Sequence, residues 1–189
     1  NYLMVPLDVE KDNLFKLLEQ LKSNGNFIGG AITTPHKISV AEWLGNKITK
    51  EAEKIGAVNT IKIASDKTLK GYNTDYYGFK KSIKPFLKPH HKKALILGTG
   101  GASKAIAYTL ERLNIPFDYV SRTSSKKTKF TYDDLNETII SSYPIIINCT
   151  PIGTHPKVNE CPNIPYDGIT KDHLLFDLIY NQIQTKFLI

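Results

Sequence analysis

The sequence predicts a two-domain α/β protein, with residues 1–86 forming the first domain and residues 87–189 the second. The length of 189 residues allows two small domains as well as one large one. After residue 92, short apolar segments alternate with helical segments, which is typical of a parallel sheet. A passage rich in proline and lysine, Lys84–Lys92, precedes this pattern and indicates a linker.

Composition excludes several classes of protein. Hydrophobic residues make up 41% of the chain and charged residues 23%, an ordinary globular balance. No apolar run approaches the roughly 20 residues that cross a bilayer, and Asn1–Glu10 lacks a secretory signal pattern. The only cysteines are Cys149 and Cys161, too few for a disulfide framework. We therefore expect a soluble cytoplasmic protein, and no metal, because no cluster of ligand residues has the required spacing.

The charge balance favours an anionic partner. Lysine and arginine total 25 against 18 acidic residues, a net charge of +7. The lysines are scattered and no aromatic platform accompanies them, which argues against nucleic acid. We expect an anionic small molecule.

The first domain should contain both strands and helices. A strand is expected at Tyr2–Val9, followed by a helix whose leucines recur from Leu14 to Leu21. A second strand, Phe27–Thr33, leads to Thr34–Pro35, where threonine favours a helix cap and proline the first helical position.

A hairpin and a further helix complete that domain. Two β-rich runs, Val58–Ile63 and Leu69–Asn73, are separated by the turn residues Ser65–Lys67. Tyr76–Lys84 is then expected to be helical.

The second domain should be a parallel sheet. Its strands are expected at Ala94–Leu97, Phe117–Val120, Ile145–Asn148 and Leu174–Leu178. The helix between the second and third of these strands should begin at the capping-box pattern of Thr131 and Asp134.

A glycine-rich turn follows the first strand of this sheet. The chain continues as Gly98-Thr99-Gly100-Gly101-Ala102-Ser103 and then as a helix, Lys104–Leu113. Gly98 suits the tight turn and Gly100 the close approach of a diphosphate, while the helix start offers free N–H groups. Ser103 stands where glycine or alanine is usual. The turn predicts a dinucleotide site, although a simple tight connection remains an alternative.

The end of the next strand indicates which dinucleotide binds. Arg122 follows Gly98 by 24 positions, close to the roughly 20 at which NAD-selective enzymes place an acid. A guanidinium there suits a 2′-phosphate, and Lys126 and Lys127 add positive charge. NADP is therefore preferred over NAD, the alternative being a solvated basic turn.

Lys37 and Asp75 are candidates for proton transfer. Lys37 is expected at the third position of the helix begun by Pro35. A cation there opposes the helix dipole and is suited to release its proton, the alternative being a solvated lysine that points into water. Asp75 would begin another helix, either as an N-cap or as the partner of that lysine in an acid/base pair. Thr33 and Asn59 flank β-rich runs. Their side chains could bind substrate hydroxyls or form hydrogen bonds with backbone groups of the turns.

Together these motifs resemble those of shikimate dehydrogenases. The resemblance covers Tyr2 to Thr185 and rests on blocks in the family's order: Gly30-Ala31-Ile32-Thr33-Thr34-Pro35-His36-Lys37, Gly56-Ala57-Val58-Asn59-Thr60, Gly71-Tyr72-Asn73-Thr74-Asp75-Tyr76-Tyr77-Gly78-Phe79, Gly98 to Ala105, Ser121-Arg122-Thr123, Asn148-Cys149-Thr150-Pro151-Ile152-Gly153 and Asp177-Leu178-Ile179-Tyr180-Asn181.

The resemblance implies a Rossmann-like NADP-binding second domain, an α/β substrate-binding first domain, and reversible reduction of 3-dehydroshikimate to shikimate by NADPH in aromatic amino-acid biosynthesis. It implies that Lys37 and Asp75 are catalytic. The substrate-binding positions would be Thr33, Asn59 and Tyr180. The cofactor positions at the diphosphate would be Gly98, Gly100, Gly101 and Ala102. Those at the 2′-phosphate would be Ser121, Arg122, Thr123 and Lys126, and Thr150 would line the cofactor cleft.

The sequence also departs from the family pattern. Ala31 and Ser121 replace asparagines, and Thr154 replaces a methionine. The family's first strand and helix, with a serine pair for the substrate carboxylate, are not in this sequence, nor are its last helices with a substrate-binding glutamine. We therefore expect an incomplete substrate domain and a piece of a longer chain.

Two other functions remain open. The protein could be a non-catalytic NADP-binding module of the same fold, or a quinate/shikimate dehydrogenase with relaxed choice of substrate. A monomer or a homodimer is expected. His36 lies inside the reactive block but is given no catalytic role.

Overall fold

The computed structural model describes residues 3–64 and 66–189. Its internal contacts divide the chain into two compact units, Asn1–Asn73 and Thr74–Ile189. We expected the boundary near residue 86, but helix α4 (Asp75–Ile83) packs with the second unit. Phe79 and Ile83 of this helix are buried in the core of the second unit, so the passage Lys84–Lys92 lies within that unit.

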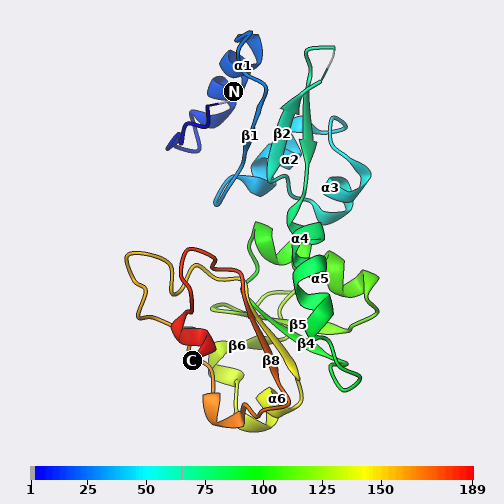
Figure 1. Cartoon of the computed structure of the whole chain (residues 1–189), viewed down its shortest axis with the longest axis vertical. Helices are drawn as coiled ribbons and strands as arrows, with labels where there is room; N and C mark the ends of the chain where they lie inside the picture. The colour runs from blue at the N-terminus through cyan, green and yellow to red at the C-terminus, as the bar shows by residue number, and fades with distance from the viewer. Residues whose placement is uncertain (1–2, 65) are drawn as a thin grey trace. The chain divides into compact units, whose positions relative to one another are not determined.

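The first unit is a small antiparallel sheet with helices packed on it (Figure 1). Strand β2 lies between β1 and β3, with Ala31 opposite Thr60 and Thr60 opposite Tyr72. The elements are α1 (Leu14–Ser23), β1 (Gly29–Ala31), α2 (Lys37–Leu44), α3 (Lys50–Ile55), β2 (Thr60–Ile63) and β3 (Leu69–Tyr72). The predicted hairpin is confirmed, whereas Ser65 of its turn lies outside the described residues.

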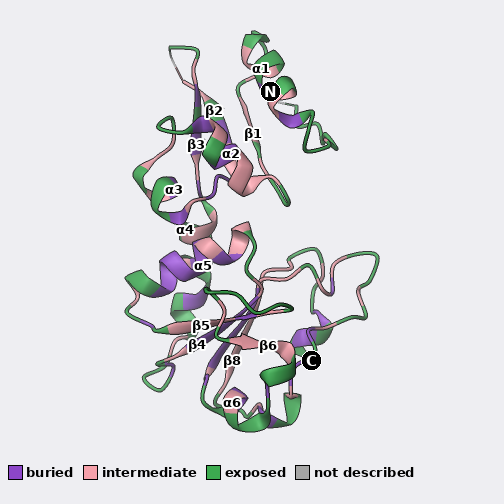
Figure 2. Cartoon of the chain, turned by 180° about the vertical axis from the view of Figure 1, so that it is seen from behind, coloured by how far each residue is buried: buried purple, intermediate pink, exposed green. Residues whose placement is uncertain are grey.

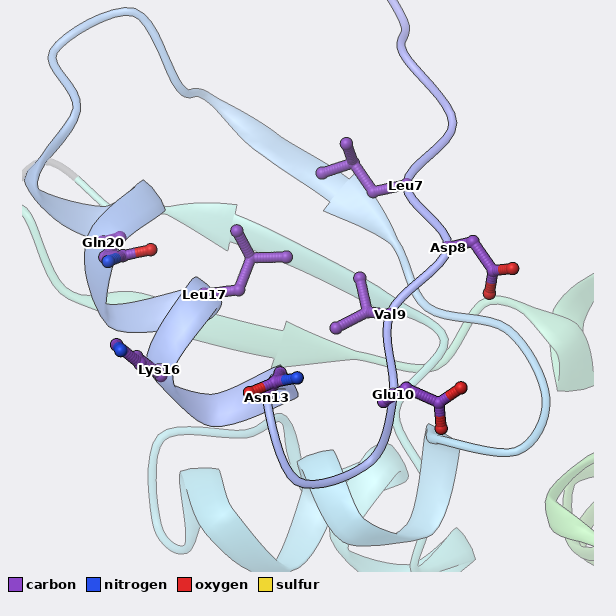
Figure 3. Close-up of a pocket in the computed structure, with 8 residues that line it drawn as sticks. All are labelled: Leu7, Asp8, Val9, Glu10, Asn13, Lys16, Leu17 and Gln20. Atoms are coloured by element: carbon purple, nitrogen blue, oxygen red, sulfur yellow. The ribbon is translucent and has the colours of Figure 1, made fainter.

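The strand predicted at Tyr2–Val9 is wrong for its described part, while Tyr2 lies outside the described residues. Residues 3–10 are not assigned to a strand. Figure 3 shows Leu7 and Val9 on the side of Leu17, with Asp8 and Glu10 turned the other way. The alternation of an extended chain is present, but no described strand supplies the ladder of hydrogen bonds that a β-strand needs.

Helix α2 begins later than the sequence indicated. Thr33–His36 forms a turn in which the His36 N–H donates to the Thr33 carbonyl at 2.9 Å, and Lys37 is the first helical residue. The prediction that Thr34 caps the helix and Pro35 opens it is wrong. Lys37 remains at the positive end of the helix dipole.

The second unit is built around a parallel sheet in the order β6-β5-β4-β7-β8. The four predicted strands are confirmed, and a short fifth strand, β6, was not expected. The elements are β4 (Ala94–Leu97), α5 (Gly101–Arg112), β5 (Phe117–Ser121), β6 (Phe130–Thr131), α6 (Glu137–Ser141), β7 (Ile145–Asn148) and β8 (Leu174–Asp177). Short 3-10 helices are η1 (Lys84–Phe86), η2 (Tyr132–Asp134), η3 (Tyr166–Gly168) and η4 (Lys186–Leu188).

Both faces of this sheet are covered, and its central strands β4 and β7 are buried along their whole length (Figure 2). Ile96 and Ile147 pack with α4 and α5 on one face. Leu97 and Ile146 pack on the other face, with Ile140 of α6. The layered α/β architecture predicted from the sequence is thus present.

The capping box at Thr131 is present but starts a different helix. The Thr131 N–H and hydroxyl both donate to the Asp134 carboxylate, at 2.6 and 2.7 Å. This box caps the N-terminus of the 3-10 helix η2, whereas the N-cap of α6 is Asn136.

Within the described residues, none of the helices has the length and hydropathy required to cross a membrane.

His91 links the segment before β4 to the loop before β8. Its Nδ1 accepts from the Lys88 N–H at 3.0 Å, and its Nε2 lies 3.2 Å from the Asp172 carbonyl. A ring that accepts at Nδ1 and donates at Nε2 is neutral. Burial lowers the pKa of His91, and the charges of His90 and Lys88 lower it further, against the opposing effect of the Asp172 carbonyl.

We predict that the free energy of unfolding falls as the pH is lowered from about 7.5 to 5.5. The unfolded chain gains a proton on His91 near its usual pKa of about 6.5, and the folded chain resists that proton. His91→Gln should flatten this slope and cost about 1 kcal/mol for each hydrogen bond lost at pH 7.5. Urea unfolding at several pH values measures both effects. The exposed His155 provides the control His155→Gln, and equal slopes for all three proteins would contradict the prediction.

Candidate functional site

The carboxyl ends of the parallel strands meet along one edge, where Gly98 makes the first turn. Gly98 has a φ of +98°, and a Cβ there would lie 3.1 Å from Cγ2 of Thr150. Its N–H donates to the Val120 carbonyl at 2.8 Å, which holds the turn beside the end of β5. A side chain at this position would be strained and would press on the next loop.

Gly100 leaves open space in front of helix α5. It is the N-cap residue of that helix, and a Cβ placed on it would meet nothing within 4 Å. The N–H groups of Gly101, Ala102 and Ser103 belong to the first turn, which has no acceptors within the helix. This open turn at a helix N-terminus fits a diphosphate.

Ser103 also has a physical explanation at its unusual motif position. Its side chain is buried, and its hydroxyl donates to the Gly100 carbonyl at 2.7 Å. The serine therefore stabilises the glycine turn and does not block it.

The basic loop follows β5 at the same edge. Ser121 is the last residue of β5 and pairs with Thr131 of β6. Arg122, Thr123 and Lys126 are exposed beyond it. Since Gly98 bonds to Val120, the glycine turn and the basic loop lie next to each other, as the predicted cofactor site requires.

A polar network at the ends of β7 and β8 was not singled out by the sequence argument. Asn148 is fully buried, and its Oδ1 accepts from the N–H of Thr150 at 3.0 Å and from its hydroxyl at 2.7 Å. Its amide donates to Asp177 at 3.1 Å, and Asp177 accepts from the Thr185 hydroxyl at 2.6 Å. The available signal was a polar residue ending each of two apolar strands.

Tyr180 lies on an exposed loop just after β8, with 95% of its surface accessible. The neighbouring Gln182 amide donates to the carbonyl of Gly153. This bond joins the Tyr180 loop to the loop that carries Thr150.

Cys149 is not suited to act as a nucleophile. Burial raises the pKa of its thiol, and the charge of Asp177 raises it further, so the thiol stays neutral. Burial likewise raises the pKa of the nearby Tyr119 to about 12.

In the first unit, three of the predicted site residues come together at one edge of the small sheet. The Ile32 N–H donates to the Asn59 carbonyl, and the Val58 N–H donates to the Lys37 carbonyl, both at 2.8 Å. Thr33 follows Ile32 directly, so Thr33, Lys37 and Asn59 share this edge. The Asn59 side chain accepts from the Thr60 hydroxyl at 3.1 Å.

Asp75 belongs to the second unit. It is the first residue of α4, and Thr74 holds the N-cap position that the alternative interpretation gave to Asp75. Before it, Asn73 is buried and donates through its amide to the Ala57 carbonyl at 3.0 Å. Asn73 is a further residue of this segment that the sequence argument did not assign.

A pocket of about 450 Å³ lies elsewhere in the first unit, between the extended segment and α1 (Figure 3). It contains none of the predicted site residues. Leu7, Val9 and Leu17 point toward one another in its lining, which also includes Asp8 and Glu10 although their carboxylates turn away. Across residues 3–64 and 66–189, no group of three or more His, Cys, Asp or Glu side chains is arranged to hold a metal.

Comparison with known proteins identifies the family. A family model described as the shikimate dehydrogenase substrate binding domain matches residues 1–61. A shikimate dehydrogenase (NADP(+)) from Methanococcus maripaludis is 36% identical over all of this chain, which spans 71% of that relative's length.

Solved structures of shikimate dehydrogenases superpose on nearly the whole chain. Shikimate dehydrogenase from Aquifex aeolicus matches with a TM-score of 0.80 and 32% identity, covering 95% of this chain and 68% of that one. A shikimate 5-dehydrogenase from Thermus thermophilus in complex with NADP(H) and shikimate matches with a TM-score of 0.79 and 26% identity, covering 96% and 69%. The resemblance seen in the sequence is confirmed, and the chain belongs to the shikimate dehydrogenase family.

Proposed function

We propose that this protein is an NADP-dependent oxidoreductase that reversibly reduces 3-dehydroshikimate to shikimate, a step of aromatic amino-acid biosynthesis. The observation that carries the proposal is the match of the whole chain to relatives of that activity. The open glycine turn beside a basic loop supports the choice of cofactor.

The second unit would bind NADP. The diphosphate would lie over the glycine turn, at Gly98, Gly100, Gly101 and Ala102. The 2′-phosphate would meet Ser121, Arg122, Thr123 and Lys126, and Thr150 would line the cleft. The open space at Gly100 and the exposed cations at the strand edge support this assignment. When bound, NADPH supplies a hydride.

Residues of the first unit, together with Asp75 and Tyr180, would bind the substrate and supply the proton. Lys37 would donate a proton to the substrate carbonyl oxygen as the hydride arrives, and would take it back in the reverse reaction. Asp75 would hold the Lys37 ammonium in position. Thr33 and Asn59, which share the sheet edge with Lys37, would bind substrate hydroxyls together with Tyr180.

We further propose a monomer or homodimer in a reducing cytoplasm. Cys149 and Cys161 are both free thiols, which suits that compartment. Light scattering of the purified protein measures its oligomeric state.

One prediction from this proposal concerns the acid/base pair. Lys37→Ala and Asp75→Asn should each lower kcat for shikimate oxidation by about 100-fold or more, the usual size of a general-acid/base contribution. The double variant should lose little beyond the worse single variant, because groups that act as a unit are not additive. The assay is NADP reduction by the full-length gene product between pH 7 and 10, with NADPH affinity measured in parallel.

Lys50 offers the matched control, because it is exposed and also begins a helix. Lys50→Ala should retain full kcat. If the wild-type protein binds NADPH but oxidises neither shikimate nor quinate, our proposal is overturned and the alternative of a non-catalytic NADP-binding module takes its place. Preferential turnover of quinate would favour the quinate/shikimate alternative.

Another prediction from this proposal concerns the choice of cofactor. Arg122→Ala should raise the KM for NADP by roughly 10-fold or more and leave the KM for NAD nearly unchanged, because an arginine–phosphate pair is a strong charge-assisted contact. Arg112, which donates to the Tyr108 hydroxyl at 3.0 Å, provides the control Arg112→Gln. Equal effects of Arg122→Ala on both cofactors would exclude its proposed contact with the 2′-phosphate.

A further inference from the structure

The hydroxyl of Tyr132 is buried without a hydrogen-bond partner. Among the described residues, only two buried side-chain polar atoms lack one, Nδ1 of His36 and this hydroxyl. Native proteins pair nearly all such atoms, because a buried unsatisfied group loses its bonds to water and gains none in return. An unpaired hydroxyl at a ligand-binding edge therefore indicates a partner that arrives with the ligand.

Strand register places Tyr132 beside Arg122. Strands β5 and β6 run parallel, with Val120 opposite Phe130 and Ser121 opposite Thr131. The residues that directly follow the last pair are Arg122, in the basic loop, and Tyr132, which begins the 3-10 helix η2 close enough for the Arg122 charge to act on it. Neighbouring strands lie about 4.8 Å apart, so one ligand group can contact both residues.

The electrostatic surroundings of Tyr132 agree with this placement. Burial raises the pKa of Tyr132, and the charge of Arg122 opposes that rise. The phenol is therefore neutral at physiological pH and acts as an O–H donor near a fixed cation. A neutral donor next to a guanidinium suits an anion with several acceptor oxygens.

Part of the side chain remains accessible although its hydroxyl is covered. The ring packs with Phe130 and Leu135 against one face of the sheet. Because the hydroxyl has no bond to lose, turning it toward a bound anion breaks no hydrogen bond of the free protein.

We propose that the Tyr132 hydroxyl donates a hydrogen bond to the 2′-phosphate of NADP beside Arg122, and so contributes to the selection of NADP over NAD. This inference rests on the proposed cofactor site at the ends of β4 and β5. It adds a residue from the end of β6, a strand that the sequence did not indicate.

Tyr132→Phe tests the proposal, because it removes only the hydroxyl. In the full-length gene product, the Kd values for NADPH and for 2′-AMP should rise by roughly 10-fold, the effect of losing a hydrogen bond to a charged group. The Kd values for NADH and 5′-AMP should change less than about twofold. Titration calorimetry measures all four without any need for turnover.

The melting temperature of the unliganded protein is a second readout. It should stay the same or rise in Tyr132→Phe, since the variant loses a buried group that has no partner. The matched control is Tyr166→Phe, because the Tyr166 hydroxyl donates to the Pro162 carbonyl at 2.9 Å. That control should lower the melting temperature and leave the ratio of NADPH to NADH affinity unchanged.

The outcomes separate this inference from the proposed function. A wild-type protein that prefers NADPH, with the same preference in Tyr132→Phe, would overturn the role of Tyr132 and leave the cofactor site standing. An equal loss of NADPH and NADH affinity would also overturn it, because the 2′-phosphate would not be involved. A wild-type protein that binds neither dinucleotide would overturn both proposals.

Discussion

The turn at Gly98 is the constraint on which the edge of the parallel sheet depends. Its left-handed backbone and the 3.1 Å approach of Thr150 to the position of a Cβ leave room for no other residue without displacement. Thr150 is itself fixed by two hydrogen bonds to Asn148, which in turn bonds to Asp177. A side chain at position 98 would therefore disturb the ends of β4, β7 and β8 together.

The parts of the fold that could be predicted are those whose signal is local. Ile145–Ile147 is apolar throughout because both faces of its strand are covered, and its length marks it as a strand. The Tyr2–Val9 prediction failed because alternation identifies an extended chain but not the partner that makes it a strand. The predicted domain boundary, after residue 86, differs from the division after Asn73 in the structure for a similar reason. Proline and lysine indicated an exposed passage at Lys84–Lys92, but the packing of Phe79 and Ile83 decides which unit that passage joins.

The residues of the candidate site also differ in whether a local sequence signal indicates them. Gly98 and Arg122 could be proposed from the sequence because each directly follows a recognisable strand at a characteristic spacing. Tyr132 could not be proposed from the sequence, because its position depends on the pairing of β6, a strand of two residues that is too short to show a period. Asn148 ends one predicted apolar strand and Asp177 lies one residue before the end of another, but only the structure shows that they bond to each other.

The cations of the basic loop act differently from the buried network at the ends of β7 and β8. Arg122 and Lys126 are exposed, and physiological salt screens exposed charges beyond about 8 Å. Their attraction for a phosphate is therefore strong only at contact, where the ligand itself excludes water. The direction of that contact must come from groups that are already fixed, namely the glycine turn bonded to Val120 and the strand pair that leads to Arg122. In the proposed cofactor site, a rigid sheet edge would thus set the geometry of binding, and the exposed charges would set its strength.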